Sequence, residues 1–85
     1  MRLDKFLKNS RLIKRRTMAK EVSDQGRITI NGNKAKAAST VSVGDELVIK
    51  FGQNIVTLQI TDLRETVKKE EAATLYKVIK EEKNE

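Results

Sequence analysis

The hydrophobic period of the sequence changes at Gly26, and this change is the strongest constraint on the fold. Before it, Met18, Ala19 and Val22 share one face of a helix. After it, residues 27–30 alternate between polar and apolar side chains, as a strand does. Glycine is well suited to the left-handed position just past a helix end. The chain therefore passes from helix to strand at this point, which indicates an α+β domain.

The helical spacing in the first part of the chain predicts two helices. Leu3, Phe6 and Leu7 recur at i, i+3 and i+4 and define the buried face of the first helix. Residues 10–13 form a short connection. The second helix is expected over residues 14–25, so that both helices precede the strands.

The middle of the chain predicts a small, mostly antiparallel sheet. Asn31 and Gly32 are the strongest short signal for a hairpin turn, and residues 33–37 would return as a short strand. Alternating apolar residues predict two further strands, over residues 46–51 and 55–60.

A last helix is expected over residues 68–82, because its apolar residues recur at helical spacing. The first and second helices would pack on the sheet, and this helix would follow it. The fold class is therefore α+β. The residues of the last apolar stripe are Ala72, Leu75, Tyr76 and Ile79.

Length and composition exclude several classes of protein. A chain of 85 residues makes one small domain. It contains no His and no Cys, so the usual general base and the usual metal ligands are missing. We therefore expect no catalytic residues, no metal and no cofactor. No apolar run reaches the roughly 18 residues of a membrane span, and the charged N-terminus is unlike a signal peptide, so we expect a cytoplasmic protein.

Positive charge is concentrated at the start of the chain. The first twenty residues hold eight basic side chains and one acidic one, whereas the remainder is balanced to within one charge. A clustered positive field attracts polyanions, so nucleic acid and an anionic membrane surface are the candidate partners. A basic face that serves only solubility is the alternative.

The expected second helix opens with three cations, where the positive end of the helix dipole favours acidic residues. A bound anion would resolve this conflict, since phosphate accepts hydrogen bonds from both backbone N–H groups and guanidinium forks. If the helix instead begins near Thr17, the arginines lie in a loop and only the charge cluster remains. The candidate anion-binding residues are Arg2, Lys5, Lys8, Lys14, Arg15, Arg16 and Lys20.

The three aromatic residues fit core positions, which argues against stacking of single-stranded bases. The composition favours recognition of the backbone and shape of folded RNA, or of duplex phosphates. The three residues are Phe6, Phe51 and Tyr76.

Four motifs, in this order, resemble the S4 RNA-binding domain family. They are RLDKFL at residues 2–7, RRTMA at 15–19, GRITING at 26–32 and VGDEL at 43–47. The resemblance covers residues 2–50 and implies an S4-type fold.

The resemblance also implies roles for individual residues. Arg16 matches the arginine of the family that contacts RNA, and Asp4 matches a position that is structural and pairs within the basic patch. The family often has Ser before that arginine, whereas this chain has Arg15, which removes a capping hydroxyl and adds a charge.

Over the whole chain the resemblance extends to small free-standing S4 proteins of ribosome-associated quality control. It implies an S4 domain over residues 1–64 and a helical extension over residues 65–85. It implies binding to 23S rRNA and peptidyl-tRNA on obstructed large ribosomal subunits, and an RqcH-type tailing factor that adds C-terminal alanine as functional partner. We expect a monomer that is not an enzyme and does not bind membranes.

Two other functions stay open at this point. The helix pair could be the helix-turn-helix of a DNA-binding regulator, although the second helix offers few base-reading side chains. The last helix and the strand edges could instead form a protein-interaction module.

Overall fold

The two N-terminal helices bury one face each, as the helical spacing predicts. Helix α1 spans Leu3–Asn9 and helix α2 spans Arg16–Asp24. The apolar face of α1 is fully buried, but in α2 Ala19 is buried while Met18 is 53% exposed, so the predicted stripe is wrong at Met18. Helix α2 also begins two residues later than predicted, because Arg15 is extended and serves as the N-cap.

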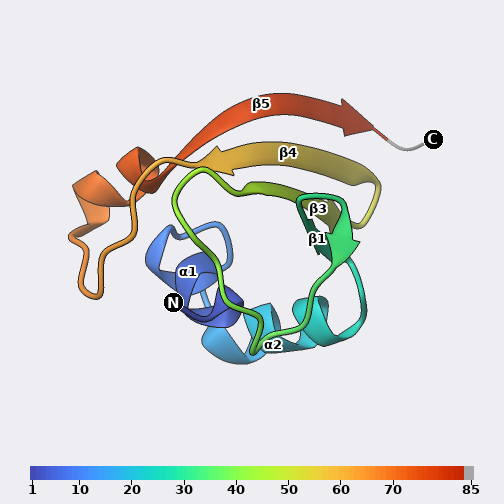
Figure 1. Cartoon of the computed structure of the whole chain (residues 1–85), viewed down its shortest axis with the longest axis horizontal. Coiled ribbons are helices and arrows are strands. Elements are labelled where there is room, and N and C mark those ends of the chain that lie inside the picture. The colour runs from blue at the N-terminus through green and yellow to red at the C-terminus, as the bar shows by residue number, and fades with distance from the viewer. Residues whose placement is uncertain (84–85) are drawn as a thin grey trace.

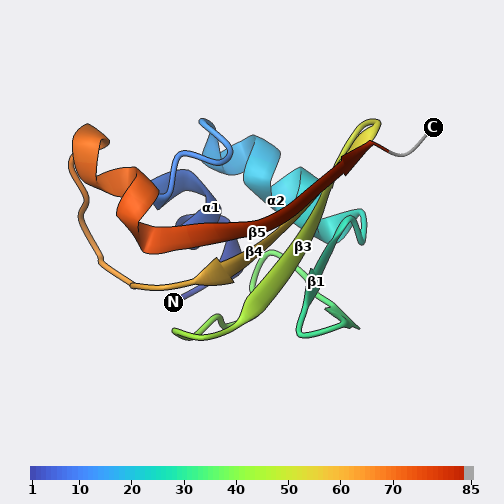
Figure 2. The ribbon, with the colours of Figure 1, turned by 90° about the horizontal axis from the view of Figure 1, so that it is seen from above.

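The structure, a computed structural model, describes residues 1–83, and its five strands form one antiparallel sheet in the order β2-β1-β3-β4-β5. Both α-helices lie on the same side of this sheet, and the two views agree on this arrangement (Figures 1 and 2). The predicted α+β class is confirmed. The strands are β1 (Ile28–Ile30), β2 (Asn33–Lys34), β3 (Glu46–Phe51), β4 (Asn54–Ile60) and β5 (Tyr76–Lys83).

The predicted hairpin turn is confirmed and is tied to a second turn. Asn31 and Gly32 both have positive φ angles, 52° and 87°, as a type I′ turn requires. The Asn31 amide donates to Asp45 Oδ1 at 3.1 Å, and Asn31 Oδ1 accepts the backbone N–H of Glu46 at 2.9 Å. Asp45 Oδ2 accepts the N–H of Ser42 at 2.8 Å. The hairpin motif and the Gly-Asp motif are therefore structural partners.

The predicted last helix over residues 68–82 is wrong beyond Leu75. Only Lys69–Leu75 is helical, as the 3-10 helix η1, and β5 follows directly. Strand β5 pairs with all seven residues of β4, from Tyr76 opposite Ile60 to Lys83 opposite Asn54. Without this partner β4 would be an edge strand with unpaired backbone groups, so the sheet overrides the local helical pattern.

One hydrophobic core joins the helices, the sheet and η1. Phe6 and Leu7 from α1, Leu47 and Leu58 from the sheet and Leu75 from η1 are all fully buried. The segment from residue 65 onward therefore contributes to the same core as the first part of the chain. The division into a domain over 1–64 and an extension over 65–85 stays a prediction, and residues 84 and 85 of that extension lie outside the described residues.

Candidate RNA interface

Backbone contacts with the loop before β3 fix the start of α1. The N–H groups of Leu3 and Asp4 donate to the carbonyl oxygens of Ser39 and Ala37 at 2.8 and 3.2 Å. These loop carbonyls satisfy donors that an N-terminal helix turn leaves free. Arg2, the N-cap residue, is held in an extended conformation beside this loop.

A buried carboxylate joins Arg2 to Arg16, the arginine to which the S4 resemblance assigns RNA contact. Arg2 Nε and Nη2 donate to the two carboxylate oxygens of Asp4 at 3.2 and 3.1 Å. Arg16 Nε lies 3.6 Å from Asp4 Oδ2. Asp4 is 2% exposed, whereas the side chains of Arg2 and Arg16 are 50% and 51% exposed. The expected structural role of Asp4 within the basic patch is confirmed.

This arrangement orients both guanidinium groups and leaves part of each available. A buried carboxylate needs paired partners, so Asp4 restricts the positions of the two arginine forks. The remaining N–H groups can donate hydrogen bonds to phosphate oxygens, because the spacing of the guanidinium N–H groups matches that of the oxygens. Thr17 and Lys20 complete the wall of a shallow hollow of 310 Å³ over these groups. Three cations and one carboxylate leave this hollow positive, which suits a phosphate.

A second group of basic residues surrounds the end of α1. Lys8, Arg11 and Lys14 line a hollow of 220 Å³. None of the three forms an ion pair within residues 1–83. Arg11 has a φ of 59°, a left-handed conformation that is uncommon for a side chain other than Gly, Asn or Asp. Arg11 was not among the predicted anion-binding residues, because nothing in the neighbouring sequence signals this backbone conformation.

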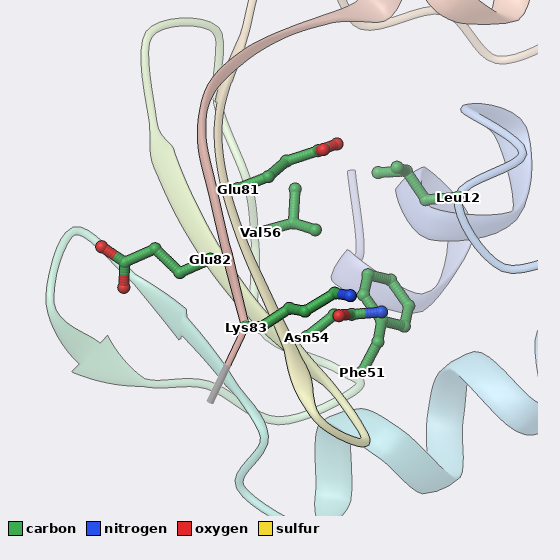
Figure 3. Close-up of a pocket in the computed structure, with 7 residues that line it drawn as sticks. All are labelled: Leu12, Phe51, Asn54, Val56, Glu81, Glu82 and Lys83. Carbon is green, nitrogen blue, oxygen red and sulfur yellow. The ribbon is translucent and has the colours of Figure 1, made fainter. Parts of the chain in front are cut away.

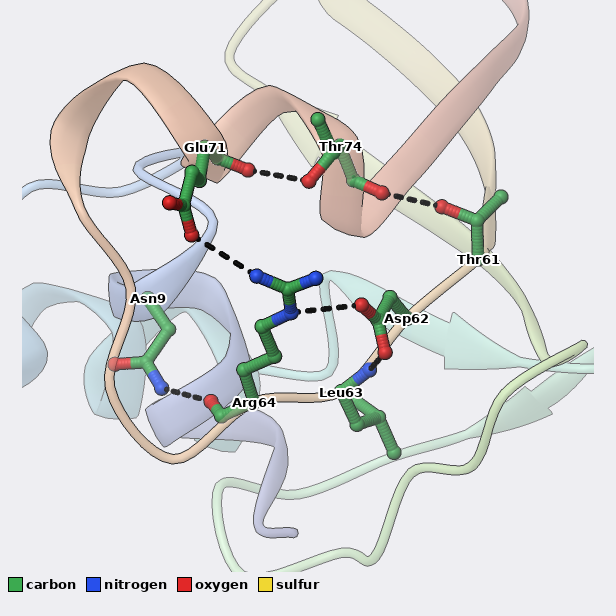
Figure 4. A network of polar contacts seen from close by, with 7 residues as sticks. All are labelled: Asn9, Thr61, Asp62, Leu63, Arg64, Glu71 and Thr74. Atoms are coloured by element: carbon green, nitrogen blue, oxygen red, sulfur yellow. Dashed lines mark hydrogen bonds and ion pairs between the residues drawn. The ribbon is translucent and has the colours of Figure 1, made fainter.

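Lys5 does not join either hollow, because a distant carboxylate holds it. Its ammonium group forms an ion pair with Glu65. Asn9 Nδ2 donates to the carbonyl oxygens of Arg64 and Glu65 at 2.9 and 3.3 Å, so the segment before η1 is tied to α1. Arg64 in turn lies between Asp62 and Glu71, 2.9 Å from a carboxylate oxygen of each (Figure 4).

The Lys5–Glu65 pair predicts a change at acidic pH. The hydrogen bond and the charge of Lys5 lower the pKa of Glu65 below its ordinary value. Because the folded-state pKa is lowered, the pair stabilises the fold above the ordinary carboxyl pKa and loses this effect as pH falls through the lowered value. We expect Lys5→Met to return the Glu65 pKa to its ordinary range in an NMR titration of the side-chain carboxyl carbon. Lys8→Met, on the same helix, should leave that pKa unchanged, and an equal change in both variants would contradict the pairing.

The seven predicted cations thus divide among four places. Arg2, Arg16 and Lys20 share the first hollow, Lys8 and Lys14 share the second, and Lys5 is paired with Glu65. Arg15 lies at the edge of an apolar groove next to α2. Their contacts with RNA stay a prediction.

Comparison with known proteins decides the family. Residues 1–47, more than half of the chain, match the family model of the S4 domain. This chain belongs to the S4 domain family. The resemblance predicted from the four motifs is therefore confirmed.

Several curated relatives of this S4 protein share one name. The "RQC P-site tRNA stabilizing factor" of Bacillus subtilis (strain 168) is 69% identical over 83 residues, which cover 98% of this chain and 96% of the relative. The factor of that name from Halalkalibacterium halodurans is 72% identical over 82 residues, covering 96% and 93%. These relatives are the RqcP proteins, the small S4 proteins that the whole chain resembles.

A solved structure shares the fold of this S4 protein. The "Trimeric structure of Vibrio cholerae Heat Shock Protein 15" superposes with a TM-score of 0.85 at 29% identity, covering 93% of this chain and 81% of that chain. The likeness confirms the S4-type fold. That protein is trimeric, and the monomeric state expected here stays a prediction. No helix in the described part of the chain is long and apolar enough to cross a membrane.

Proposed function

We propose that this S4 protein binds RNA in ribosome-associated quality control and steadies tRNA in the P site of obstructed large ribosomal subunits. The name of its relatives supports this function. The observation that carries the proposal is the hollow in which buried Asp4 orients Arg2 and Arg16 beside Lys20. Two oriented guanidinium forks and an ammonium group suit sugar-phosphate oxygens better than scattered lysines would.

The finer parts of the proposal follow from the resemblance. The protein contacts 23S rRNA and peptidyl-tRNA, and it supports C-terminal alanine tailing together with an RqcH-type factor. It acts in the cytoplasm as a binding factor without catalytic residues, metal or cofactor. Its contribution is electrostatic, because the basic side chains neutralise phosphates and so hold a tRNA position.

Binding to ribosomal particles tests the proposal directly. We expect the protein to sediment with large subunits and not with small subunits. If about six phosphates are neutralised, the logarithm of the association constant should fall by roughly 4 to 5 for each tenfold rise in salt. A filter-binding titration of large subunits across salt concentrations measures this slope.

The two other functions would give different results. A DNA-binding regulator would prefer duplex DNA over ribosomal RNA fragments in competition at fixed salt. A protein-interaction module would keep its partner after RNase treatment. Equal sedimentation with both subunits, or a slope near zero, would contradict the proposed function.

A further inference from the structure

An apolar groove lies between α2 and the end of β3, next to the basic residues. Its apolar walls are formed by Leu12, Met18, Val22 and Phe51, and its volume is 370 Å³. Met18 is 53% exposed although its neighbour Ala19 is fully buried. The helix therefore presents a large apolar side chain to this groove rather than to the core.

The groove continues toward β5 in a second hollow of 620 Å³ that shares Leu12 and Phe51. Figure 3 shows the Phe51 ring facing this space, with the Asn54 amide beside it and Leu12 on the opposite wall. Phe51 is only partly buried, unlike Phe6, so part of its ring is available to a ligand. An aromatic ring can stack on a planar group, and an amide beside it can hydrogen-bond to the edge of that group.

The charges around the groove are unequal at its two ends. Lys14 and Arg15 lie at the end next to α2, and Lys14 also lines the hollow that contains Lys8 and Arg11. The far end is lined by Glu81, Glu82 and Lys83, whose charges sum to −1. An anionic group is therefore favoured at the Lys14 end, and a neutral planar group fits the apolar part.

We propose that this groove takes one unpaired nucleotide of the bound RNA, with its base between Met18 and Phe51 and its phosphate at Lys14. The inference rests on the proposed function and adds a base contact to a surface that otherwise contacts backbone. A paired base has its faces covered by its neighbours, whereas an unpaired base offers a free face for stacking. A purely apolar peptide would gain nothing from the cations that line this groove, which is why a nucleotide is the better occupant.

Three RNA hairpins that differ at one position test the proposal. They carry one bulged adenosine, an abasic residue at the bulge, or no bulge, and each is titrated with the full-length protein at fixed salt. We expect the bulged adenosine to raise affinity by roughly fivefold or more over the abasic bulge, as base stacking on apolar side chains does. Met18→Gln should remove this preference, and its salt dependence should stay that of the unaltered protein.

A matched control separates this effect from general surface changes. Ile79 on β5 has the same exposure as Met18, 53%, so Ile79→Gln should keep the preference. Phe51→Leu is a second variant that should also lose it, with its thermal unfolding measured alongside to verify folding.

Each outcome bears on one of the two proposals. If the protein binds all three RNAs equally, or if Met18→Gln keeps the preference, the nucleotide site is wrong while the proposed function stands. If it binds large subunits and none of the hairpins, the nucleotide site is likewise wrong. If Met18→Gln changes the oligomeric state in gel filtration but not the RNA preference, the groove is an interface between copies. If neither hairpins nor large subunits bind, the proposed function fails as well.

Discussion

Arg16→Glu is expected to reduce binding to large ribosomal subunits by about 100-fold or more. The change removes an oriented guanidinium fork, and two charge-assisted hydrogen bonds to a phosphate together account for a loss of that size. It also places a carboxylate near Asp4, which lies 3.6 Å from Arg16 Nε. The new carboxylate would repel the buried carboxylate of Asp4. This repulsion would also displace Arg2, which Asp4 holds, so both guanidinium forks are affected. Sedimentation and filter binding measure the loss.

Two further variants separate charge, fork geometry and folding. Arg16→Lys keeps the charge but not the fork, so we expect an intermediate loss of roughly tenfold. Lys50→Glu makes the same change of charge on β3, at an exposed position that alternates with buried Leu47 and Ile49 and so faces away from the helices. It should bind nearly as the unaltered protein does. Normal binding by a folded Arg16→Glu variant would show that this hollow is not the RNA site.

Leu75→Ala is expected to lower the free energy of unfolding by about 2–5 kcal/mol, because it leaves a cavity at a fully buried position. Small domains have only about 5–15 kcal/mol in total, so the variant should unfold at a clearly lower denaturant concentration. Urea unfolding followed by circular dichroism measures the difference. The reason lies in the position of η1, whose Leu75 completes the core beneath the sheet.

Ile79→Ala provides the matched comparison for this prediction. Ile79 follows four residues later in β5 but is 53% exposed, so its loss should cost less than about 1 kcal/mol. If Leu75→Ala cost no more than Ile79→Ala, the segment after residue 64 would contribute little to the core. The predicted division of the chain at that residue would then be a real boundary between folding units.

Those parts of the fold that depend on local chemistry could be predicted from the sequence. The turn at Asn31 and Gly32 needs positive φ at both residues, and few residue types permit this. Strands β3 and β4 were predicted to within a residue because their alternation matches a half-buried sheet. The end of the chain was predicted as helix because Leu75 and Ile79 are four residues apart. Such spacing carries no information about the backbone hydrogen bonds to β4, which make this segment a strand.

In the candidate site, too, features formed by residues close in the sequence could be predicted, whereas contacts between residues far apart in the sequence could not. The charge cluster could be inferred from the first twenty residues, and the pairing of Asp4 within it was implied by the S4 resemblance. The pairing of Lys5 with Glu65 could not, since the two residues are 60 positions apart. The exposure of Met18 was not predicted. Leu12 and Phe51 line a groove beside Met18 and do not cover it, and the spacing of apolar residues in a helix does not indicate how completely a neighbouring element covers that helix.

The order of the strands has a consequence for biosynthesis. One edge of β4 pairs with β3, which directly precedes it in the sequence. The other edge pairs only with β5, which runs to Lys83. During translation, the nascent polypeptide exposes one unpaired edge of β4 and an incomplete core until that last segment has emerged. Cooperative folding therefore needs β5, and shorter nascent lengths depend on avoiding edge-to-edge association.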